Sequence, residues 1–498
     1  MSTTINPSID GVSDVAYNQD ANGNVIGFPN PSSNGGILDT FPHRPSPVAQ
    51  KCNRIVRGGN NFYSFTDHTV LLNTGTENAN YVLSTVSGVN GIAYDNSGSQ
   101  TGSPTMVKLA VSGQAGAANN FIASPNNLAL TMVDNKFGFW VYYSPDSTWA
   151  VPNLHIRLAA TNVPNGTTDW DFSMNINQMR PGWNFLVVIP LNATHPYGIT
   201  AVNGSESFAA GATTLNKFDF YLKVTAGQTC TLYFDTAWNN FYTKPAVMLG
   251  LDGVNAATLP TYSIPIMAKY GFRGYMMNSA QATNDNSIWK DFTTRHANTD
   301  LAYAAGWDIC NHTLNHTTTS TGTPPLATSL LTAAQLQYLL TAQTSYQLAM
   351  GWDRGKEFYG APTGSWDNTN VALIKMAGYT MQRNSSVSHQ NNTRTQWGYD
   401  QPQNMGWISL DNPTQGLTGA YLSNWEANIQ PLLDYGGDVW IGWHDVVAGS
   451  GNMSAYTNSV TQIYHDQLDA LCAWLAGLQA AGTISVMTPT ECAYNLKS

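Results

Sequence analysis

The stretch AVMLGLDG, from Ala246 to Gly253, decides the fold of the C-terminal half of the chain. Its apolar part, residues 245–251, predicts a buried β-strand with Asp252 at its end. Downstream, apolar runs alternate with helical stretches. Helices are expected at 260–270, 332–350 and 465–481, and strands at 438–443 and 483–487. This alternation predicts a parallel sheet or barrel with helices outside, in which catalytic groups gather at the carboxyl ends of the strands.

The N-terminal half of the chain has a different texture. Short alternating apolar runs separated by turn-rich clusters fill residues 61–240 and predict an all-β sandwich. These runs include 106–111, 137–143, 154–158, 218–224 and 230–234. Residues 1–60 are rich in Gly, Pro, Asn and Ser and predict an extended arm. The expected fold class is therefore multidomain: an arm (1–60), a β-sandwich (61–240) and an α/β unit (244–498).

The composition limits the classes of partner. Of the 498 residues, 42% are hydrophobic, which is enough for a core and excludes general disorder. Only 10% are charged, and 21 Lys and Arg against 31 Asp and Glu give a net charge of −10. The chain therefore lacks the basic surface by which proteins bind nucleic acid or an anionic membrane, and we expect neither partner.

Targeting signals and cysteine chemistry are also limited by the sequence. No apolar run reaches the roughly 18 residues of a transmembrane helix, and the N-terminus lacks the cationic and apolar regions of a signal peptide. The five cysteines are far apart and show no CxxC spacing, which argues against a disulfide framework or a cysteine zinc site. Cys472 and Cys492 are the one pair considered for a disulfide.

The strongest chemical motif is GWDICNHTLNH, from Gly306 to His316. His312 and His316 are four residues apart, so on a helical turn both imidazoles would point to one side, as two ligands of one zinc-like ion do. The alternative is a pair of ordinary surface or core histidines. Asp252 and His444, each at the end of an apolar strand, favour the first interpretation. A carboxylate with two histidines forms an open metal site that leaves room for water or substrate.

The order of these motifs resembles the NodB-type polysaccharide deacetylases, metal-dependent carbohydrate esterases on a distorted (β/α) barrel. The resemblance covers 244–498. MLGLDG (248–253) stands where the family has TFDDG, and 306–316 follows the family's GHEIGNHTxxH closely. The segment 360–364 occupies the Arg-Pro-Pro-Tyr-Gly turn, and 441–445 fits the family's Leu-His-Asp strand end. We expect this unit to remove acetyl groups from a polysaccharide.

Carried over position by position, the resemblance implies a role for each residue. Asp252, His312 and His316 would hold a divalent metal ion, with Zn²⁺ expected. The backbone N–H of Thr363 would help to form an oxyanion hole. His444 would protonate the leaving amine or alcohol as general acid.

Aromatic residues near these motifs are candidate substrate contacts. Trp443 replaces a family leucine and would form a wall of the acetate pocket. Trp366 directly follows the third motif, and aromatic faces stack on sugar rings, so we expect it to be a sugar platform. Trp397 and Trp407 are further platform candidates. For each of them, core packing is the alternative.

Two positions depart from the family pattern. The family's catalytic base, the first Asp of Asp-Asp-Gly, is Leu251 here, and the third-motif Arg that orients this base is Gly360. The candidates for a replacement base are Asp445 and Asp367, and the candidates for the positive charge are Arg383 and Arg354. Two alternatives stay open: attack by metal-bound hydroxide without a dedicated base, and a domain that binds sugar without turnover. The fourth motif, expected within 384–407, is not recognisable; His389 and Asp400 are weak candidates.

The biological setting follows from circumstance. The segment 182–235 resembles the last strands of jelly-roll carbohydrate-binding modules, so the sandwich is expected either to contact sugar or to act as a spacer. A low-charge composition with a sandwich and a glycan-modifying domain resembles a bacteriophage tail protein acting on host capsule or O-antigen, located extracellularly or in the virion. That setting implies a homotrimer. The rival interpretation is a glycan-binding adhesin with an impaired deacetylase-like domain.

Overall fold

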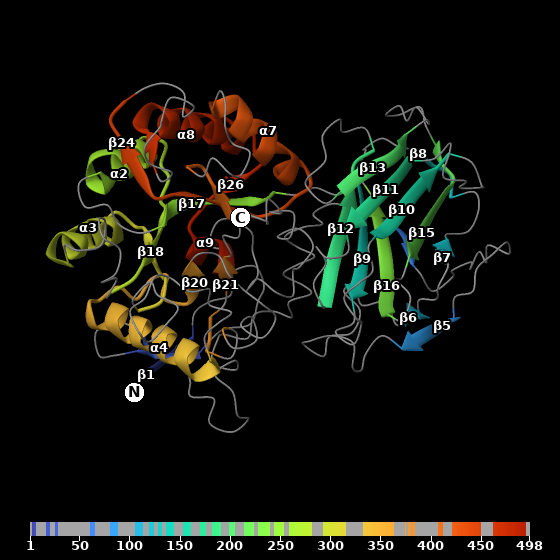
Figure 1. Ribbon diagram of the computed structural model, residues 1–498, viewed down its shortest axis with the longest axis horizontal. Coiled ribbons are helices and arrows are strands. Elements are labelled where there is room, and N and C mark those ends of the chain that lie inside the picture. The colour runs from blue at the N-terminus through green and yellow to red at the C-terminus, as the bar shows by residue number, and fades with distance from the viewer. Residues whose placement is uncertain are drawn as a thin grey trace.

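The computed structural model contains two main units, a β-sandwich and an α/β unit (Figure 1). The structure describes residues 2–5, 16–19, 25–27, 60–64, 80–87, 105–112, 119–123, 128–131, 136–143, 153–160, 170–175, 182–190, 199–204, 214–223, 228–239, 244–252, 258–280, 292–314, 332–362, 374, 377–379, 381–383, 407–411, 421–449 and 462–494.

Two antiparallel sheets form the N-terminal unit. The first has the order β13-β11-β10-β15-β7, with bounds Ile199–Gly204, Trp170–Asn175, Asn153–Ala159, Lys217–Lys223 and Asn119–Ala123. The second has the order β12-β9-β16-β6-β5, with bounds Gly182–Val188, Phe137–Tyr143, Thr229–Asn239, Thr105–Ser112 and Asn80–Ser87, and β4 (Asn60–Ser64) also pairs with β16. A short pair, β8 (Leu130–Thr131) with β14 (Thr214–Leu215), stands beside them.

Aromatic side chains hold the two sheets together. Phe139 of β9 packs edge-on against Phe220 of β15 with ring centroids 5.0 Å apart, and Phe220 lies 4.9 Å from Phe234 of β16. All three rings are fully buried. The sheets therefore pack face to face as a sandwich, as the alternating runs predict. Residues 2–27, expected in the arm, include a small antiparallel sheet of β1 (Ser2–Ile5), β2 (Ala16–Gln19) and β3 (Val25–Gly27).

The C-terminal unit is built on a parallel sheet with the order β21-β20-β19-β18-β17-β23-β22. The bounds are Met381–Arg383, Phe358–Gly360, Asp308–Asn311, Tyr275–Asn278, Ala246–Asp252, Val439–Trp443 and Trp407–Ser409, and β26 (Ser485–Val486) also pairs with β17. The first strand, β17, pairs with both the second, β18, and the last, β23. The order is thus that of a barrel opened between β21 and β22, which agrees with the predicted (β/α) barrel.

The side chains of this sheet point to two different cores. Residues that alternate along β17 point into the barrel, where Met248 packs with Tyr275, Met277, Phe358, Trp407 and Trp440. The residues between them, Val247, Leu249 and Leu251, belong to an outer core. Because successive side chains of a strand point to opposite faces, Asp252 lies on the barrel side and Leu251 on the outer side.

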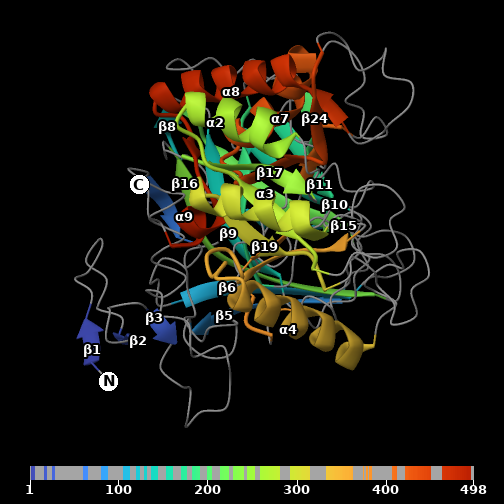
Figure 2. The same ribbon diagram turned by 90° about the vertical axis from the view of Figure 1, so that its left-hand side faces the viewer.

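Helices cover the outer face of the sheet (Figure 2). They are η4 (Leu259–Ser263), α2 (Ile264–Lys269), α3 (Phe292–Ala304), α4 (Ala333–Ala349), α7 (Tyr421–Asp434) and α8 (His465–Ala480). The start of α4 is fixed by a capping box between Thr332 and Gln335, which satisfies two backbone N–H groups that the helix leaves free. None of the helices that the structure describes is long and apolar enough to cross a membrane.

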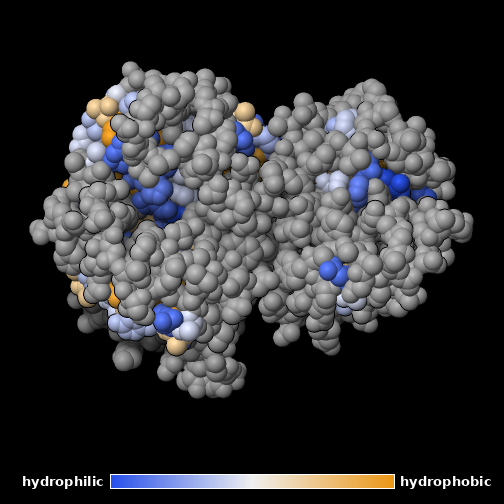
Figure 3. All heavy atoms as spheres, in the orientation of Figure 1, coloured by the Kyte–Doolittle hydropathy of each residue, from blue (hydrophilic) through white to orange (hydrophobic). Residues whose placement is uncertain are grey.

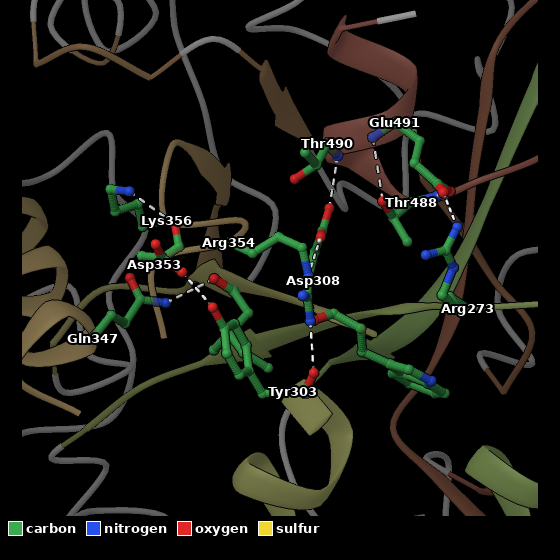
Figure 4. A network of polar contacts seen from close by, with 12 residues as sticks. Arg273, Tyr303, Asp308, Gln347, Asp353, Arg354, Lys356, Thr488, Thr490 and Glu491 are labelled. Atoms are coloured by element: carbon green, nitrogen blue, oxygen red, sulfur yellow. Dashed lines mark hydrogen bonds and ion pairs between the residues drawn. The ribbon is translucent and has the colours of Figure 1, made fainter. Parts of the chain in front are cut away.

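The last helix, α9 (Pro489–Tyr494), contacts the amino ends of the strands through polar side chains (Figure 4). The Thr490 N–H donates to Asp308 at the start of β19, over 2.6 Å, and Arg273 forms an ion pair with Glu491. The sandwich contacts the barrel through a hydrogen bond between the backbone of Ile189 and Tyr435, in the turn that precedes β23. This contact lies at the amino end of β23. Because the strands are parallel, their carboxyl ends lie together at the opposite edge of the sheet.

The cysteines that the structure describes are thiols rather than disulfides. Cys472 lies in α8 and Cys492 in α9, and both are buried. Cys472 packs in the outer core and Cys492 in the barrel core, so the sheet separates the two sulfur atoms. The disulfide considered from the sequence does not form.

Candidate active site

Five polar side chains meet at the carboxyl edge of the barrel, each at the end of a different strand. Asp252 is the last residue of β17, His312 follows β19, Arg383 ends β21, Asp411 follows β22 and His444 follows β23. Strands this short bring only one or two side chains to the edge. The convergence of all five on one place is therefore a consequence of the parallel topology.

Asp252 is the centre of this cluster. One carboxylate oxygen forms an ion pair with Arg383 and lies 3.9 Å from the Nε2 atom of His312. The other oxygen lies 4.0 Å from the Nε2 atom of His444. Asp252 is only 7% exposed, whereas the His444 side chain is 33% exposed. His444 is therefore the more exposed partner of this carboxylate.

His312 is held in one tautomer. Its Nδ1 atom lies 2.7 Å from the Gly360 carbonyl oxygen, which accepts only from a protonated nitrogen, and its Nε2 atom faces Asp252. The chain is anchored by the Ser279 hydroxyl, which donates to the His312 carbonyl, and by the Thr313 N–H, which donates to Asn311. Such a fixed imidazole is typical of a metal ligand.

The backbone after β19 differs from the helical turn expected for the two histidines. His312 directly follows a strand, and Thr313 has a φ of 62° in the left-handed region, which a helix does not allow. The described residues 312–314 therefore do not form the helical turn on which the four-residue spacing relied. His316 itself lies outside the described residues, as do Thr363 and Trp366.

His444 forms a dyad with Asp411, a residue that the sequence motifs do not single out. The fully buried Asp411 carboxylate lies 3.1 Å from His444 Nδ1 and accepts the His444 backbone N–H over 2.6 Å. Ser409 donates to the same carboxylate over 2.7 Å. Asp411 thus holds the proton on Nδ1 and directs Nε2 at Asp252. This is the arrangement of a general acid or base with its orienting carboxylate.

Arg383 supplies the positive charge of the site, as one of the two candidates considered for that role. It is fully buried, and its guanidinium carbon lies 4.1 Å from the centroid of the Trp407 ring. Burial lowers the pKa of Arg383 to about 9, which still leaves the guanidinium charged at neutral pH. The other candidate, Arg354, binds the Trp307 and Tyr303 carbonyl groups and Asp308, at the amino ends of the strands.

Asp445, a candidate base, is occupied by structural contacts. One of its oxygens accepts the Thr258 hydroxyl and the Val446 N–H, and the other accepts the Gln462 amide over 2.9 Å. The residue is 3% exposed. These bonds join the loop after β17 to β24 (Asp445–Val447) and β25 (Gln462–Tyr464). Asp445 thus links these segments, and its role as a base stays a prediction.

Two tryptophans also lie elsewhere than expected. Trp443, expected in the wall of an acetate pocket, is fully buried in the outer core beside Leu251, on the face of β23 opposite to His444. Trp407, a candidate sugar platform, is 5% exposed inside the barrel under Arg383. Both rings pack in cores because their strands are buried on both faces.

The donors that the structure describes fit a divalent cation. Asp252 offers a carboxylate, and His312 offers an imidazole nitrogen whose partner nitrogen is already bound to a backbone carbonyl, which is the usual pattern around zinc. Within the described residues no group of three His, Cys, Asp or Glu side chains is gathered closely enough to hold a metal alone. The third expected ligand, His316, is not among them. Figure 3 shows hydrophilic residues, in blue, over the region of β17 and β18.

No protein-family model and no curated protein matches the chain. Among solved structures, a peptidoglycan deacetylase, PdaC from Bacillus subtilis, is 14% identical over 51% of this chain and 93% of that one, with a TM-score of 0.30. A CE4 family pseudoenzyme, BA3943 from Bacillus anthracis, is 13% identical over 51% and 68%, with a TM-score of 0.29. Carbohydrate-binding modules of a β-sandwich superfamily are 14% identical over 37% and 63%, with a TM-score of 0.24. Likenesses this low carry no argument about activity.

Proposed function

We propose that this chain is a metal-dependent deacetylase that removes acetyl groups from a bacterial surface polysaccharide, such as capsule or O-antigen. The observation that carries the proposal is the position of Asp252, 3.9 Å from Nε2 of His312 and 4.0 Å from Nε2 of His444. A carboxylate and an imidazole that suit a cation thus lie next to a second imidazole that suits proton transfer. Together with the order of the sequence motifs, this favours hydrolysis of an acyl group.

The residues of the chain have separate tasks in this proposal. Asp252 and His312, joined by His316, would hold the cation, for which we propose Zn²⁺. When bound, such an ion polarises the acetyl carbonyl and activates water. The protonated Nε2 of His444 would deliver its proton to the leaving nitrogen or oxygen, while Asp411 stabilises the charged imidazole and keeps its orientation. The Thr363 N–H would stabilise the oxyanion, and Trp366 would stack on a sugar ring.

The proposal is tested by acetate release from acetylated bacterial polysaccharides. Protein loaded with Zn²⁺ is compared with chelated protein and with His312→Ala, and Arg273→Gln serves as a control distant from the site. We expect acetate only from the loaded wild type and the control. The proposal fails if His312→Ala or the chelated protein releases acetate as fast as the loaded wild type.

A second candidate function is a glycan-binding adhesin in which the deacetylase-like domain is impaired. The observation in its favour is Leu251, which places an apolar side chain where the family's base stands. Binding of polysaccharide that persists in His312→Ala and His444→Ala, with no acetate release from the wild type, would support it. In either case we propose a bacteriophage tail setting with a homotrimer. Light scattering of the purified protein tests the trimer.

A further inference from the structure

Arg383 reaches Asp252 through a space that a glycine leaves open. Gly360 on β20 and Arg383 on β21 are register partners at the carboxyl edge. A Cβ atom on residue 360 would lie 3.1 Å from Arg383 Nε and 2.6 Å from Met277 Sδ. Any side chain at this position would therefore press on the arginine and on the methionine beneath it.

Arg383 also spans the opening of the barrel. β21 and β22 are not paired in the sheet, yet the Arg383 guanidinium packs on the ring of Trp407 from β22. The planar cation thus has an aromatic face on one side and the Asp252 carboxylate at its end. These contacts fix the guanidinium on elements from both sides of the opening.

The charge of this pair matters for any cation at the site. Asp252 and Arg383 are both buried, so solvent screens their interaction only weakly. A cation that binds Asp252 meets a carboxylate whose charge Arg383 has already compensated. Removing the arginine charge would leave Asp252 free to bind the cation more tightly, although less firmly placed.

We propose that Arg383 is the positioning residue of this site: from β21, through the space left by Gly360, it orients Asp252 and weakens the hold of Asp252 on the metal ion. The proposal rests on the proposed function for the identity of Asp252 as a metal ligand. It assigns to Arg383 a charge that the sequence motifs place at residue 360.

The first test measures cation affinity, with Co²⁺ as the probe in calorimetric titrations of the full chain. Arg383→Gln should bind Co²⁺ at least ten-fold more tightly than the wild type, while its acetate release falls ten-fold or more. The control Arg273→Gln removes a half-exposed arginine at the other end of the barrel and should leave both values unchanged. A variant that only loosened the fold would bind Co²⁺ more weakly. Equal or weaker binding by folded Arg383→Gln would overturn the proposal.

The second test measures the coupling of the two residues without metal or substrate. Arg383→Gln and Asp252→Asn should each lower the Tm of the metal-free protein, because each leaves a buried charge without its partner. The double variant should regain much of the loss. If the Tm losses of the two single variants simply added in the double variant, the pairing would be overturned. This result does not depend on Co²⁺ binding.

A glycine substitution tests the space itself. Gly360→Ala should displace Arg383 and reproduce the tighter Co²⁺ binding, whereas Gly477→Ala, whose added Cβ would meet no other part of the protein within 4 Å beyond its own helix, should leave the Co²⁺ affinity unchanged. An unchanged Co²⁺ affinity in Gly360→Ala would remove the glycine from the proposal. The Co²⁺ affinity and melting measurements need no turnover, so a wild type that releases no acetate refutes the proposed function and leaves the role of Arg383 to those two measurements.

Discussion

Leu251 and Asp252 are consecutive residues that face opposite sides of β17. Leu251 is buried in the outer core between sheet and helices, and Asp252 forms an ion pair with Arg383 inside the carboxyl edge. The family's motif has two carboxylates in these places. Here the outward position joins the hydrophobic core, and only the inward one is a carboxylate.

Restoring the missing carboxylate at position 251 should therefore fail. Leu251→Asp would bury a charge among apolar side chains, including Trp443, and should lower the free energy of unfolding by about 3 kcal/mol or more. Acetate release should not rise. Leu251→Met, similar in volume, is the control and should cost less than about 1.5 kcal/mol. Urea denaturation measures the stability and acetate assays the release; faster acetate release by Leu251→Asp than by the wild type would show that residue 251 can act at the site.

The Asp411–His444 dyad gives a second prediction. His444→Gln should lower kcat by about 10²–10⁴-fold, the usual value of a general acid or base. Asp411→Asn should act through His444 and lower kcat by about ten-fold or more, with little change in KM. Ser409→Ala removes a hydrogen bond to Asp411 from the far side and should have a smaller effect. Steady-state kinetics of the variants on one acetylated substrate measure these changes in kcat and KM. Equal activity of wild type and Asp411→Asn would show that the dyad takes no part in catalysis.

The strand ends made much of the site predictable from the sequence. Asp252 and His444 each end an apolar run, and parallel strands bring such positions to one edge, so their convergence could be expected; His312, predicted on a helical turn, instead follows β19 (Asp308–Asn311). Asp411 could not, because β22 has only three residues, Trp407–Ser409, beside an Asn-rich region where no periodicity is visible. The segment expected to hold the fourth motif ends at residue 407, just before Asp411. The one sequence signal that could have indicated Asp411 is its position directly after the short apolar run WISL, residues 407–410.

The faces of the tryptophans could not be predicted for a related reason. Strands in a parallel barrel are covered on both sides, so their sequences are apolar throughout and do not alternate. Val439–Trp443 reads VWIGW, in which Trp440 points into the barrel and Trp443 away from it. Their faces become clear only from the pairing with β17, in which Trp440 lies beside Met248 and Trp443 beside Leu251. Arg383, likewise, reaches Asp252 through tertiary packing that its local sequence does not encode.

Asp445 should matter for stability more than for chemistry. Asp445→Asn keeps its size but weakens the acceptors for Thr258 and Gln462, so unfolding should become easier by about 1–3 kcal/mol. Acetate release at a temperature where the variant is folded should stay within about ten-fold of the wild type. Thermal denaturation and acetate assays are compared with those of His444→Gln. A loss of activity as large as that of His444→Gln, without destabilisation, would instead identify Asp445 as the base.

The buried Asp308 carboxylate predicts how stability depends on pH. Burial raises its pKa to about 7 from the ordinary value of 3.8, against the opposing effect of the Thr490 N–H (Figure 4). The folded state therefore holds this proton more firmly than the unfolded state does. Between about pH 4 and pH 7 its contribution to stability falls as pH rises, and above pH 7 the cost of the buried charge is fully present.

Asp308→Asn should remove this dependence. An amide at residue 308 can still accept the Thr490 N–H but carries no charge, so relative to wild type the variant should be more stable at pH 8 than at pH 5, by a few kcal/mol. Urea denaturation at the two pH values measures the difference, and histidine titration cancels because both proteins share it. Asp469→Asn is the control: its hydrogen bond with Lys269 lowers the pKa of Asp469 below the ordinary 3.8, so its stabilisation is lost only below about pH 4 and its effect should be the same at pH 5 and pH 8. Equal effects of Asp308→Asn at both pH values would mean that Asp308 is ionised throughout this range, held by Arg354.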